Sequence, residues 1–264
     1  MILKNSKTPL ISIITVVYNN EKDIRNAIES VLDQNYEYIE YIVIDGGSDD
    51  GTIDVINEYR DHISVFISET DNGIYDALNK GISHSSGDFI AILHSDDLFC
   101  NSRVVSNIAN KISQSSRLEL YFSDMVIVDR ASDKVLRYYT ASFFKPWMLR
   151  IGYMPPHPTC FIKKKLFDEF GLYSLDYKIA SDFDFLVRIF FGREIKWSYL
   201  NQVTVKMKQG GISNSGFWSK KLIINEIHQS LKLNGVRSLR IIQLMRYLVR
   251  LKEFMTKPKK GKCD

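Results

Sequence analysis

The first hundred residues alternate between short, almost wholly apolar segments and longer segments whose apolar residues recur at helical spacing. Continuous apolar runs of this length are typical of strands that are covered on both faces. The four runs are residues 10–17, 41–44, 63–68 and 88–93. The helical segments between them are residues 19–34, 52–59 and 73–85. Repeated strand–helix units predict an α/β fold with a mostly parallel central sheet, right-handed connections and helices on both faces.

From residue 119 the regular alternation is replaced by longer strands and separate helices. Two strands, residues 120–129 and 134–140, are predicted on either side of a polar turn at Arg130 to Asp133. Further elements are predicted as helices at 163–170 and 182–191, short strands near 195–207, and helices at 217–233 and 237–256. No linker-like composition precedes residue 210. The predicted organisation is therefore a domain over residues 1–211, with halves at 1–100 and 101–211, and a helical C-terminal extension at 212–264.

Polar side chains follow each of the four strands predicted in the first half. In an open α/β sheet, ligands bind beyond the carboxyl ends of the parallel strands, so these side chains are expected at the ligand site. They are Tyr18 and Asn19 after the first strand, Asp45 after the second, Glu69, Asp71 and Asn72 after the third, and His94, Asp96 and Asp97 after the fourth. Three of the four strand ends are thus acidic, which is the wrong charge for gripping bare phosphate.

Acidic strand ends favour a ligand that is held through a divalent cation. The sequence has no GxGxxG and no GxxxxGK[ST] segment, so neither of the usual Gly-rich phosphate cradles is indicated. Mg²⁺ and Mn²⁺ prefer oxygen ligands and are commonly bound by one or two carboxylates together with substrate phosphates. A bound cation would neutralise the adjacent charges of Asp96 and Asp97, although a turn with a helix cap is the alternative for this pair alone. The three cysteines, Cys100, Cys160 and Cys263, form no CxxC pair, so neither a zinc site nor a disulfide framework is indicated.

The motifs of the first hundred residues together resemble glycosyltransferase family 2, the large group of inverting enzymes with the GT-A fold. Between residues 9 and 100 the resemblance is carried by ISIITVVYNNEKDIRNAIESVLDQ, YIVIDGGSDDGT, ETDNGIYDALNKGI and GDFIAILHSDD. The acceptor side of bacterial members that build capsule, O-antigen and exopolysaccharide resembles residues 155–189, PPHPTCFIKKKLFDEFGLYSLDYKIASDFDFLVRI, and the QGGIS that follows at 209–213. The resemblance implies a nucleotide-binding half, an acceptor-side half, and transfer of a sugar from a nucleotide sugar, most often a UDP-sugar, to a saccharide or lipid-linked acceptor.

The resemblance also implies which positions hold the donor. The nucleotide-binding positions are Thr15, Val17 and Tyr18 in the base pocket, Asp45 on the base, and Asp71 and Lys80 near the base, ribose and pyrophosphate. Asp97 would bind the metal ion, Mn²⁺ or Mg²⁺, and Asp96 would contact the ribose or the water shell of the metal. His94 stands where many relatives carry Asp or Asn. It could bind the metal or a phosphate oxygen, or be held by the backbone.

A carboxylate in the second half is the candidate catalytic base. The resemblance aligns Asp182 with a carboxylate at the start of a helix, and Ser181 stands where relatives often carry Glu. A helix N-terminus stabilises a carboxylate, and in an inverting transfer such a group takes the proton of the attacking hydroxyl. Asp184, about 200° further round the helix, is the alternative base. His157 is a weaker candidate for the acceptor side, with a packed loop histidine as the alternative.

The C-terminal extension is strongly basic. Residues 232–264 hold ten of the 35 Lys and Arg residues but two of the 31 Asp and Glu residues. On a helix over 241–255 most apolar residues fall on one side and the arginines on the other, and KPKKGK follows. Such a helix can lie on an anionic membrane surface, or it can pack on the core with its charged face in solvent.

The expected protein is therefore a cytoplasmic enzyme whose tail could also contact the inner face of the cell membrane. Nucleic acid is not expected as a partner, because the basic tail lacks interleaved aromatic residues. Two other functions are weighed against this one. A nucleotidyltransferase would carry a Gly-rich, Arg-containing loop after the first strand, where this chain has VYNNE. A non-catalytic nucleotide-binding scaffold would not need both Asp97 and Asp182.

Overall fold

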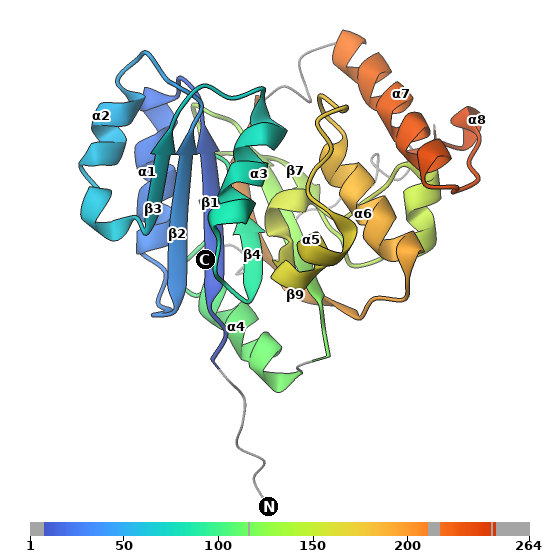
Figure 1. Cartoon of the computed structure of the whole chain (residues 1–264), viewed down its shortest axis with the longest axis horizontal. Helices are drawn as coiled ribbons and strands as arrows, with labels where there is room; N and C mark the ends of the chain where they lie inside the picture. The colour runs from blue at the N-terminus through green and yellow to red at the C-terminus, as the bar shows by residue number, and fades with distance from the viewer. Residues whose placement is uncertain (1–7, 116, 211–216, 244, 247–264) are drawn as a thin grey trace, which may run out of the picture.

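The computed structural model describes residues 8–115, 117–210, 217–243, 245 and 246, which form a sheet with helices around it (Figure 1). The strands are β1 (Ile11–Val17), β2 (Ile39–Asp45), β3 (Val65–Ser68), β4 (Phe89–Ile92), β5 (Asp97–Phe99), β6 (Leu120–Val128), β7 (Val135–Tyr139), β8 (Phe161–Lys163) and β9 (Trp197–Lys208). The α-helices are α1 (Glu21–Leu32), α2 (Thr52–Asn57), α3 (Ile74–His84), α4 (Val104–Gln114), α5 (Lys164–Phe170), α6 (Ser181–Gly192), α7 (Phe217–Leu233) and α8 (Arg240–Gln243). Short 3-10 helices lie at Arg60–His62, Pro146–Ile151 and His157–Thr159.

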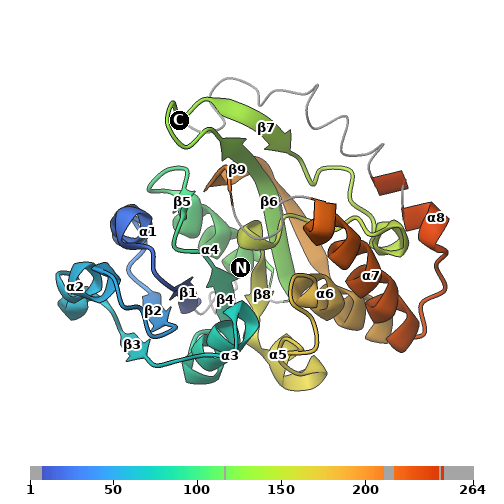
Figure 2. The same ribbon diagram turned by 90° about the horizontal axis from the view of Figure 1, so that it is seen from above.

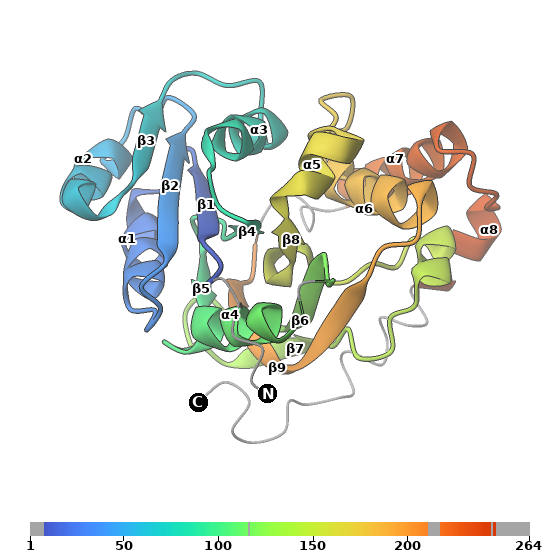
Figure 3. The ribbon, with the colours of Figure 1, turned by 60° about the horizontal axis from the view of Figure 1, so that its bottom comes forward.

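All nine strands belong to one mixed sheet, in the order β3-β2-β1-β4-β8-β6-β9-β5, with β7 paired to β6. Neighbouring strands from β3 to β4 are parallel, and β6 and β9 are parallel to each other. Strands β8, β5 and β7 pair antiparallel with their neighbours. Helices α1 and α4 cover one face of the sheet, and α3, α5 and α6 cover the other (Figures 2 and 3). The predicted α/β fold with a mostly parallel sheet is confirmed.

The pairing register brings the ends of the first strands to one edge of the sheet. Val17 pairs with Asp45, Asp45 pairs with Ser68, and Ile14 pairs with Ile92. Every residue of β1 is buried, as expected for a continuous apolar run with helices on both faces. The polar residues that follow these strands therefore start from neighbouring positions.

Four elements, β5, α4, β8 and β9, differ from the predicted element list. β8 is three residues long and lies antiparallel between β4 and β6, and β5 begins at Asp97 itself. Helix α4 fills a segment for which no element was predicted. The short strands predicted near 195–207 are one strand of 12 residues, β9, which pairs with β6 along its length. Strands of three residues are too short to show a period of two, which is why the sequence pattern does not reveal them.

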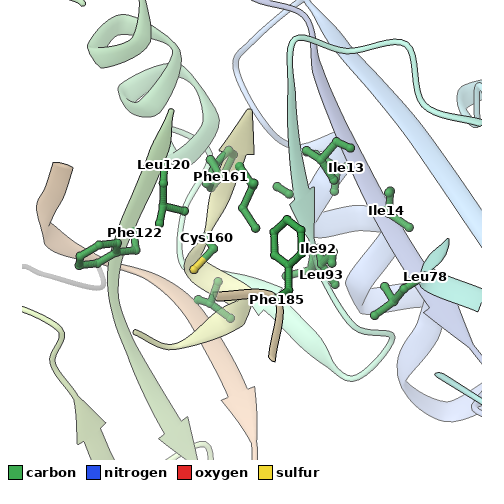
Figure 4. Packing of buried hydrophobic residues seen from close by; sticks show 14 of the residues in the cluster. Ile13, Ile14, Leu78, Ile92, Leu93, Leu120, Phe122, Cys160, Phe161 and Phe185 are labelled. Atoms are coloured by element: carbon green, nitrogen blue, oxygen red, sulfur yellow. The ribbon is translucent and has the colours of Figure 1, made fainter. Parts of the chain in front are cut away.

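A continuous apolar core joins the two halves across β4 and β8. Figure 4 shows side chains from β1, β4, β8 and β6 packed in one cluster, with Phe185 of α6 reaching into it. The rings of Phe185 and Phe167 are stacked with their centroids 4.4 Å apart. Complete burial of a side chain of this size contributes about 1.5–3 kcal/mol. The helix that begins at Ser181 is thereby anchored to the sheet.

Helix α7 packs against α6 on the side of the molecule remote from α1 and α2 (Figure 1). The buried carboxylate of Glu226 on α7 accepts hydrogen bonds of 2.9 Å from three successive backbone N–H groups, those of residues 178–180. These groups lie in the loop that leads into α6. Helix α7 therefore fixes the backbone immediately before Asp182.

The second helix of the predicted extension is described only at its start. Helix α8 is described from Arg240 to Gln243, and residues 247–264 lie outside the described residues. In the part of the chain that is described, no helix combines the length and the apolar character needed to cross a membrane.

Candidate active site

A cleft of about 500 Å³ lies at the edge of the sheet where the parallel strands end. The first half contributes Val17, Tyr18, Asp71, His94 and Asp96 to its walls. The second half contributes His157, Lys178, Asp182 and Lys208. Most of the predicted site residues thus meet in one hollow, although residues 18 and 182 are far apart in the sequence.

Asp97 directly follows the cleft residue Asp96 but is not itself among the residues that line the cleft, and its carboxylate is unsatisfied. Its side chain is fully buried, and neither of its oxygens has a hydrogen-bond partner among the described residues. Burial, with a smaller effect from the neighbouring Asp96, raises the pKa of Asp97 well above its usual range. A buried carboxylate without a partner is costly, so this position calls for a cation or a proton.

The residues present fit a metal ion that is shared with a ligand. Within the described ranges, no three His, Cys, Asp or Glu side chains gather into a metal-binding cluster. A cation at Asp97 would therefore depend on ligand oxygens for most of its coordination. Mg²⁺ and Mn²⁺ bind in this way when one or two carboxylates and substrate phosphates share them.

Asp182, the predicted base, lines the cleft from the first turn of α6. Its Oδ1 accepts a 2.8 Å hydrogen bond from the backbone N–H of Phe183 and lies 3.3 Å from the hydroxyl of Tyr75. Burial raises the pKa of Asp182 to about 6, against the smaller lowering effects of these hydrogen bonds and of nearby His94. The carboxylate is therefore mostly ionised at pH 7 and more basic than an exposed aspartate.

Asp184, the alternative base, is buried and bound by side chains of α6, of α7 and of the residues that follow α7. It is buried at 4% exposure, and its Oδ1 accepts hydrogen bonds from Ser230 at 2.8 Å and from Asn234 at 3.0 Å. Its Oδ2 pairs with Arg188 at 2.9 Å. Asp184 is not among the residues that line the cleft, and its carboxylate instead ties α6 to α7. The geometry favours Asp182 as the group that can reach a ligand.

Two histidines, His94 and His157, line the cleft together with Asp182. Nε2 of His157 lies 2.8 Å from the hydroxyl of Tyr173, and burial lowers the pKa of His157 to about 4. Burial, followed by the proximity of His157, also lowers the pKa of His94. Nδ1 of His94 is buried and has no hydrogen-bond partner among the described residues. Both imidazoles are therefore neutral at pH 7, and both line the cleft.

Four of the seven predicted nucleotide-sugar-binding residues line the cleft: Val17, Tyr18, Asp71 and Asp96. Tyr18 is 64% exposed, which leaves its ring free to cover a ligand. A Cβ atom at Gly46 would lie 2.5 Å from Oδ2 of Asp71 and 3.5 Å from the ring of Tyr18. A glycine at position 46 therefore leaves the carboxylate of Asp71 its place in the cleft wall.

The other three, Thr15, Asp45 and Lys80, are not among the residues that line the cleft. Thr15 accepts a 3.2 Å hydrogen bond from the hydroxyl of Tyr41. Asp45 is fully buried. Its carboxylate accepts hydrogen bonds of 3.1 Å from two backbone N–H groups of the turn that follows β2, and one from the hydroxyl of Ser68. The amine of Lys80 pairs with a carboxylate of Glu69 at 2.9 Å. Contacts of these three residues with a donor stay predictions.

The structure adds cleft residues that the sequence analysis does not single out. They include Tyr75 on α3, Lys178 in the loop before α6, and Met207 and Lys208 at the end of β9. Their positions in the sequence could have indicated two of them, because Tyr75 lies inside the motif ETDNGIYDALNKGI and Lys208 directly precedes the motif QGGIS. Lys208 brings a positive charge to the acidic end of the cleft.

Comparison with known sequences identifies the relatives of this chain. The family model described as glycosyl transferase family 2 matches residues 12–166. An uncharacterized glycosyltransferase of Mycobacterium tuberculosis is 32% identical over 188 residues, which cover 69% of this chain and 70% of that protein. A PGL/p-HBAD biosynthesis glycosyltransferase of Mycobacterium bovis is 25% identical over 211 residues, which cover 78% of this chain and 80% of that protein.

Comparison with solved structures supports the same fold. TarS of S. aureus, residues 1–349 in complex with UDP-GlcNAc, superimposes with a TM-score of 0.69 at 18% identity, covering 91% of this chain and 72% of TarS. The mannosyltransferase PcManGT of Pyrobaculum calidifontis, in complex with GDP-Man and Mn²⁺, superimposes with a TM-score of 0.58 at 14% identity, covering 96% and 82%. At these identities the likeness shows a shared fold.

Proposed function

Because this chain belongs to glycosyltransferase family 2 and is a glycosyltransferase, we propose that it catalyses a metal-dependent inverting transfer from a nucleotide-sugar donor. The donor is proposed to be a UDP-sugar and the acceptor a saccharide or a polyprenyl-diphosphate-linked saccharide of bacterial surface polysaccharide synthesis. Solved structures of the same fold are complexes with UDP-GlcNAc, and with GDP-Man and Mn²⁺, which supports a nucleotide-sugar donor.

One observation carries the metal dependence: the fully buried carboxylate of Asp97, whose two oxygens have no partner among the described residues. We propose that Asp97, with Asp96 beside it, holds Mn²⁺ or Mg²⁺ together with the diphosphate of the donor. When bound, the cation would supply electrostatic stabilisation of the negative charge that grows on the departing diphosphate.

Asp182 then acts on the acceptor, while Asp96 and Asp97 act on the diphosphate of the donor. Asp182 accepts the proton of an acceptor hydroxyl as its oxygen forms a bond to the anomeric carbon. The bond between that carbon and the diphosphate oxygen breaks on the opposite side, so the configuration inverts. A pKa of about 6 suits Asp182 to this step, because the group is ionised at pH 7 and still binds a proton readily.

A donor screen tests this function directly. Purified full-length protein is mixed with UDP-sugars, GDP-mannose and dTDP-sugars, each with and without Mn²⁺, and binding is measured by calorimetry. We expect one UDP-sugar to bind, and binding to depend on Mn²⁺ because the protein offers only one or two metal-binding carboxylates of its own. Slow hydrolysis of that donor should also appear without acceptor. Preference for GDP-mannose would overturn the proposal that the donor carries uridine. Donor binding that is unaffected by Mn²⁺ would overturn the proposed metal dependence.

We propose that the basic C-terminal segment brings the enzyme to the cytoplasmic face of the membrane. Four lysines lie within six residues at Lys257, Lys259, Lys260 and Lys262. Each basic residue near an anionic surface contributes about 1 kcal/mol of attraction. Replacement of all four by glutamine should therefore lower the affinity for phosphatidylglycerol vesicles by about 100-fold or more at low salt, as measured by flotation. A wild-type protein that stays with the soluble fraction would exclude this location.

A further inference from the structure

A buried aspartate on α1, outside the cleft, holds two basic residues at the acidic end of the active site. Asp23 is 5% exposed, and each of its carboxylate oxygens has a different cationic partner. Its Oδ1 accepts a hydrogen bond of 2.7 Å from Nζ of Lys208, and its Oδ2 accepts one from Nη1 of Arg130. The partners lie 185 and 107 residues away in the sequence, so only the folded chain brings them together.

Both cations are carried by backbone that is itself fixed. Val128 and Lys208 pair at the ends of β6 and β9, and the N–H of Gln209 donates to the carbonyl of Val128 at 2.8 Å. Arg130 lies two residues beyond Val128, in a turn that is closed by a 2.9 Å bond from the N–H of Asp129 to the carbonyl of Lys134. The neighbouring ends of two paired strands therefore deliver the two charges to one place.

The two cations also face the acidic site. Lys208 lines the cleft. Nη2 of Arg130, the nitrogen that does not bind Asp23 Oδ2, lies 3.6 Å from Oδ2 of Asp96. Arg130 thus bridges a buried carboxylate and a cleft carboxylate through different nitrogens. An incoming anionic oxygen can take the place of Asp96 at Nη2 while Nη1 stays on Asp23.

We propose that Arg130 and Lys208 form the anion-binding side of the diphosphate site, and that Asp23 is the positioning residue that holds both. This inference rests on the proposed nucleotide-sugar donor and names residues that recognise its diphosphate. The ligand class is a nucleoside diphosphate that lies between these cations and the carboxylates of Asp96 and Asp97. When the donor is bound, Arg130 exchanges its contact with Asp96 for a phosphate oxygen, and Asp96 becomes free for the ligand.

Asp23 serves the site by removing freedom from two flexible side chains before the ligand arrives. Lysine and arginine lose much rotamer entropy when they are immobilised, and a ligand that had to order both would bind more weakly. Although burial alone would raise it, the hydrogen bonds from Lys208 and Arg130 lower the pKa of Asp23, so it stays ionised at neutral pH. An amide at this position has no negative charge and one acceptor oxygen in place of two, so it holds the two cations more weakly.

The test compares ligands with and without phosphate on the full-length protein. Affinity for UDP and GDP in the presence of Mn²⁺ is measured by calorimetry, and affinity for uridine by ligand-observed NMR. We expect Asp23→Asn to weaken UDP binding by about tenfold or more and to leave uridine binding unchanged. Lys208→Met should show a similar loss. The double variant should lose less than the two single losses combined, because both act through one anchored unit.

Glu58→Gln is the matched control. It breaks an ion pair of 2.7 Å with Arg25, another residue of α1, away from the cleft, and should leave UDP affinity unchanged. Equal UDP affinity in wild type and Asp23→Asn would overturn the inference, as would a parallel loss of UDP and uridine, which a merely structural role predicts. If Asp23→Asn does not fold, unchanged UDP binding by Lys208→Met overturns it. A wild-type protein that binds neither UDP nor GDP with Mn²⁺ would instead overturn the proposed function and, with it, this site.

Discussion

Replacement of Asp182 with asparagine should leave donor binding intact and reduce the rate of sugar transfer by about 10²–10⁴-fold. The side chain lines the cleft and retains its size in the variant, so the donor pocket is unchanged. The amide cannot take the proton of the acceptor hydroxyl, so the acceptor must attack unassisted. Calorimetry with the donor and a transfer assay at saturating donor separate the two effects. Transfer near the wild-type rate would remove Asp182 as the base.

The pH dependence of transfer by the wild-type enzyme should report the ionisation of Asp182. Only ionised Asp182 can accept a proton, and burial raises its pKa to about 6. The value of kcat/KM is therefore expected to be level above pH 7 and to fall about tenfold for each pH unit below 6. In Asp182→Asn this acidic decline should disappear. A decline that survives the substitution would belong to another group.

Asp184→Asn distinguishes the two candidate aspartates. This substitution weakens the buried pair with Arg188, and breaking such a pair costs about 3–5 kcal/mol of stability. The expected result is a lower melting temperature with a transfer rate close to wild type in the folded fraction. A folded Asp184→Asn protein without transfer activity, beside an active Asp182→Asn protein, would reverse the assignment.

Replacement of Asp97 with asparagine should abolish the contribution of Mn²⁺ to donor binding. The carboxylate is fully buried next to the cleft residue Asp96, and a neutral amide is a far weaker ligand for a hard divalent cation. We expect UDP affinity in the presence of Mn²⁺ to fall by about 100-fold or more, to the level of the wild-type protein without metal. Calorimetry with and without Mn²⁺ measures this difference. Asp61→Asn, which changes an exposed aspartate of the 3-10 helix Arg60–His62 outside the residues that line the cleft, should keep the full response to Mn²⁺.

Asp97→Asn lowers UDP affinity, but it should not lower the stability of the metal-free protein. The pKa of Asp97 is raised in the folded protein, so without metal its contribution to stability is fully present below the unfolded pKa and is lost as pH rises through the folded pKa. At pH 7 the metal-free Asp97→Asn protein should therefore melt at or above the temperature of the metal-free wild type. Mn²⁺ together with UDP should raise the melting temperature of the wild type but not that of Asp97→Asn. An equal rise in both proteins would place the metal elsewhere.

The sequence pattern predicts the first half of the fold well because its strands obey a simple rule. A parallel strand covered on both faces must be apolar throughout, and its ligand-facing residues must come at its end. Tyr18, Asp71, His94 and Asp96 follow from this rule and do line the cleft. The rule also selects Asp45, whose oxygens in fact bind the turn after β2. Residue type at a strand end is visible in the sequence, but the direction of the carboxylate is not.

The second half is less predictable because its site residues depend on long-range pairing. Lys208 reaches Asp23 because β9 pairs with β6 in one particular register, and no local pattern of either segment encodes that register. β8 and β5 are also too short to be recognised by periodicity. Helix α4 was predictable in principle, since its buried residues recur at helical spacing from Val104 to Ile112.

The three hydrogen bonds that Glu226 accepts also bear on how this enzyme could be recombined with its relatives. An enzyme engineer who exchanged C-terminal segments at residue 211 would separate α7 from the loop whose backbone it holds. The chimera would keep every side chain of the cleft and still lose the support of Asp182. A junction in the loop after α7, at Gly235, keeps Glu226 with the loop it binds and leaves the basic tail free to be exchanged.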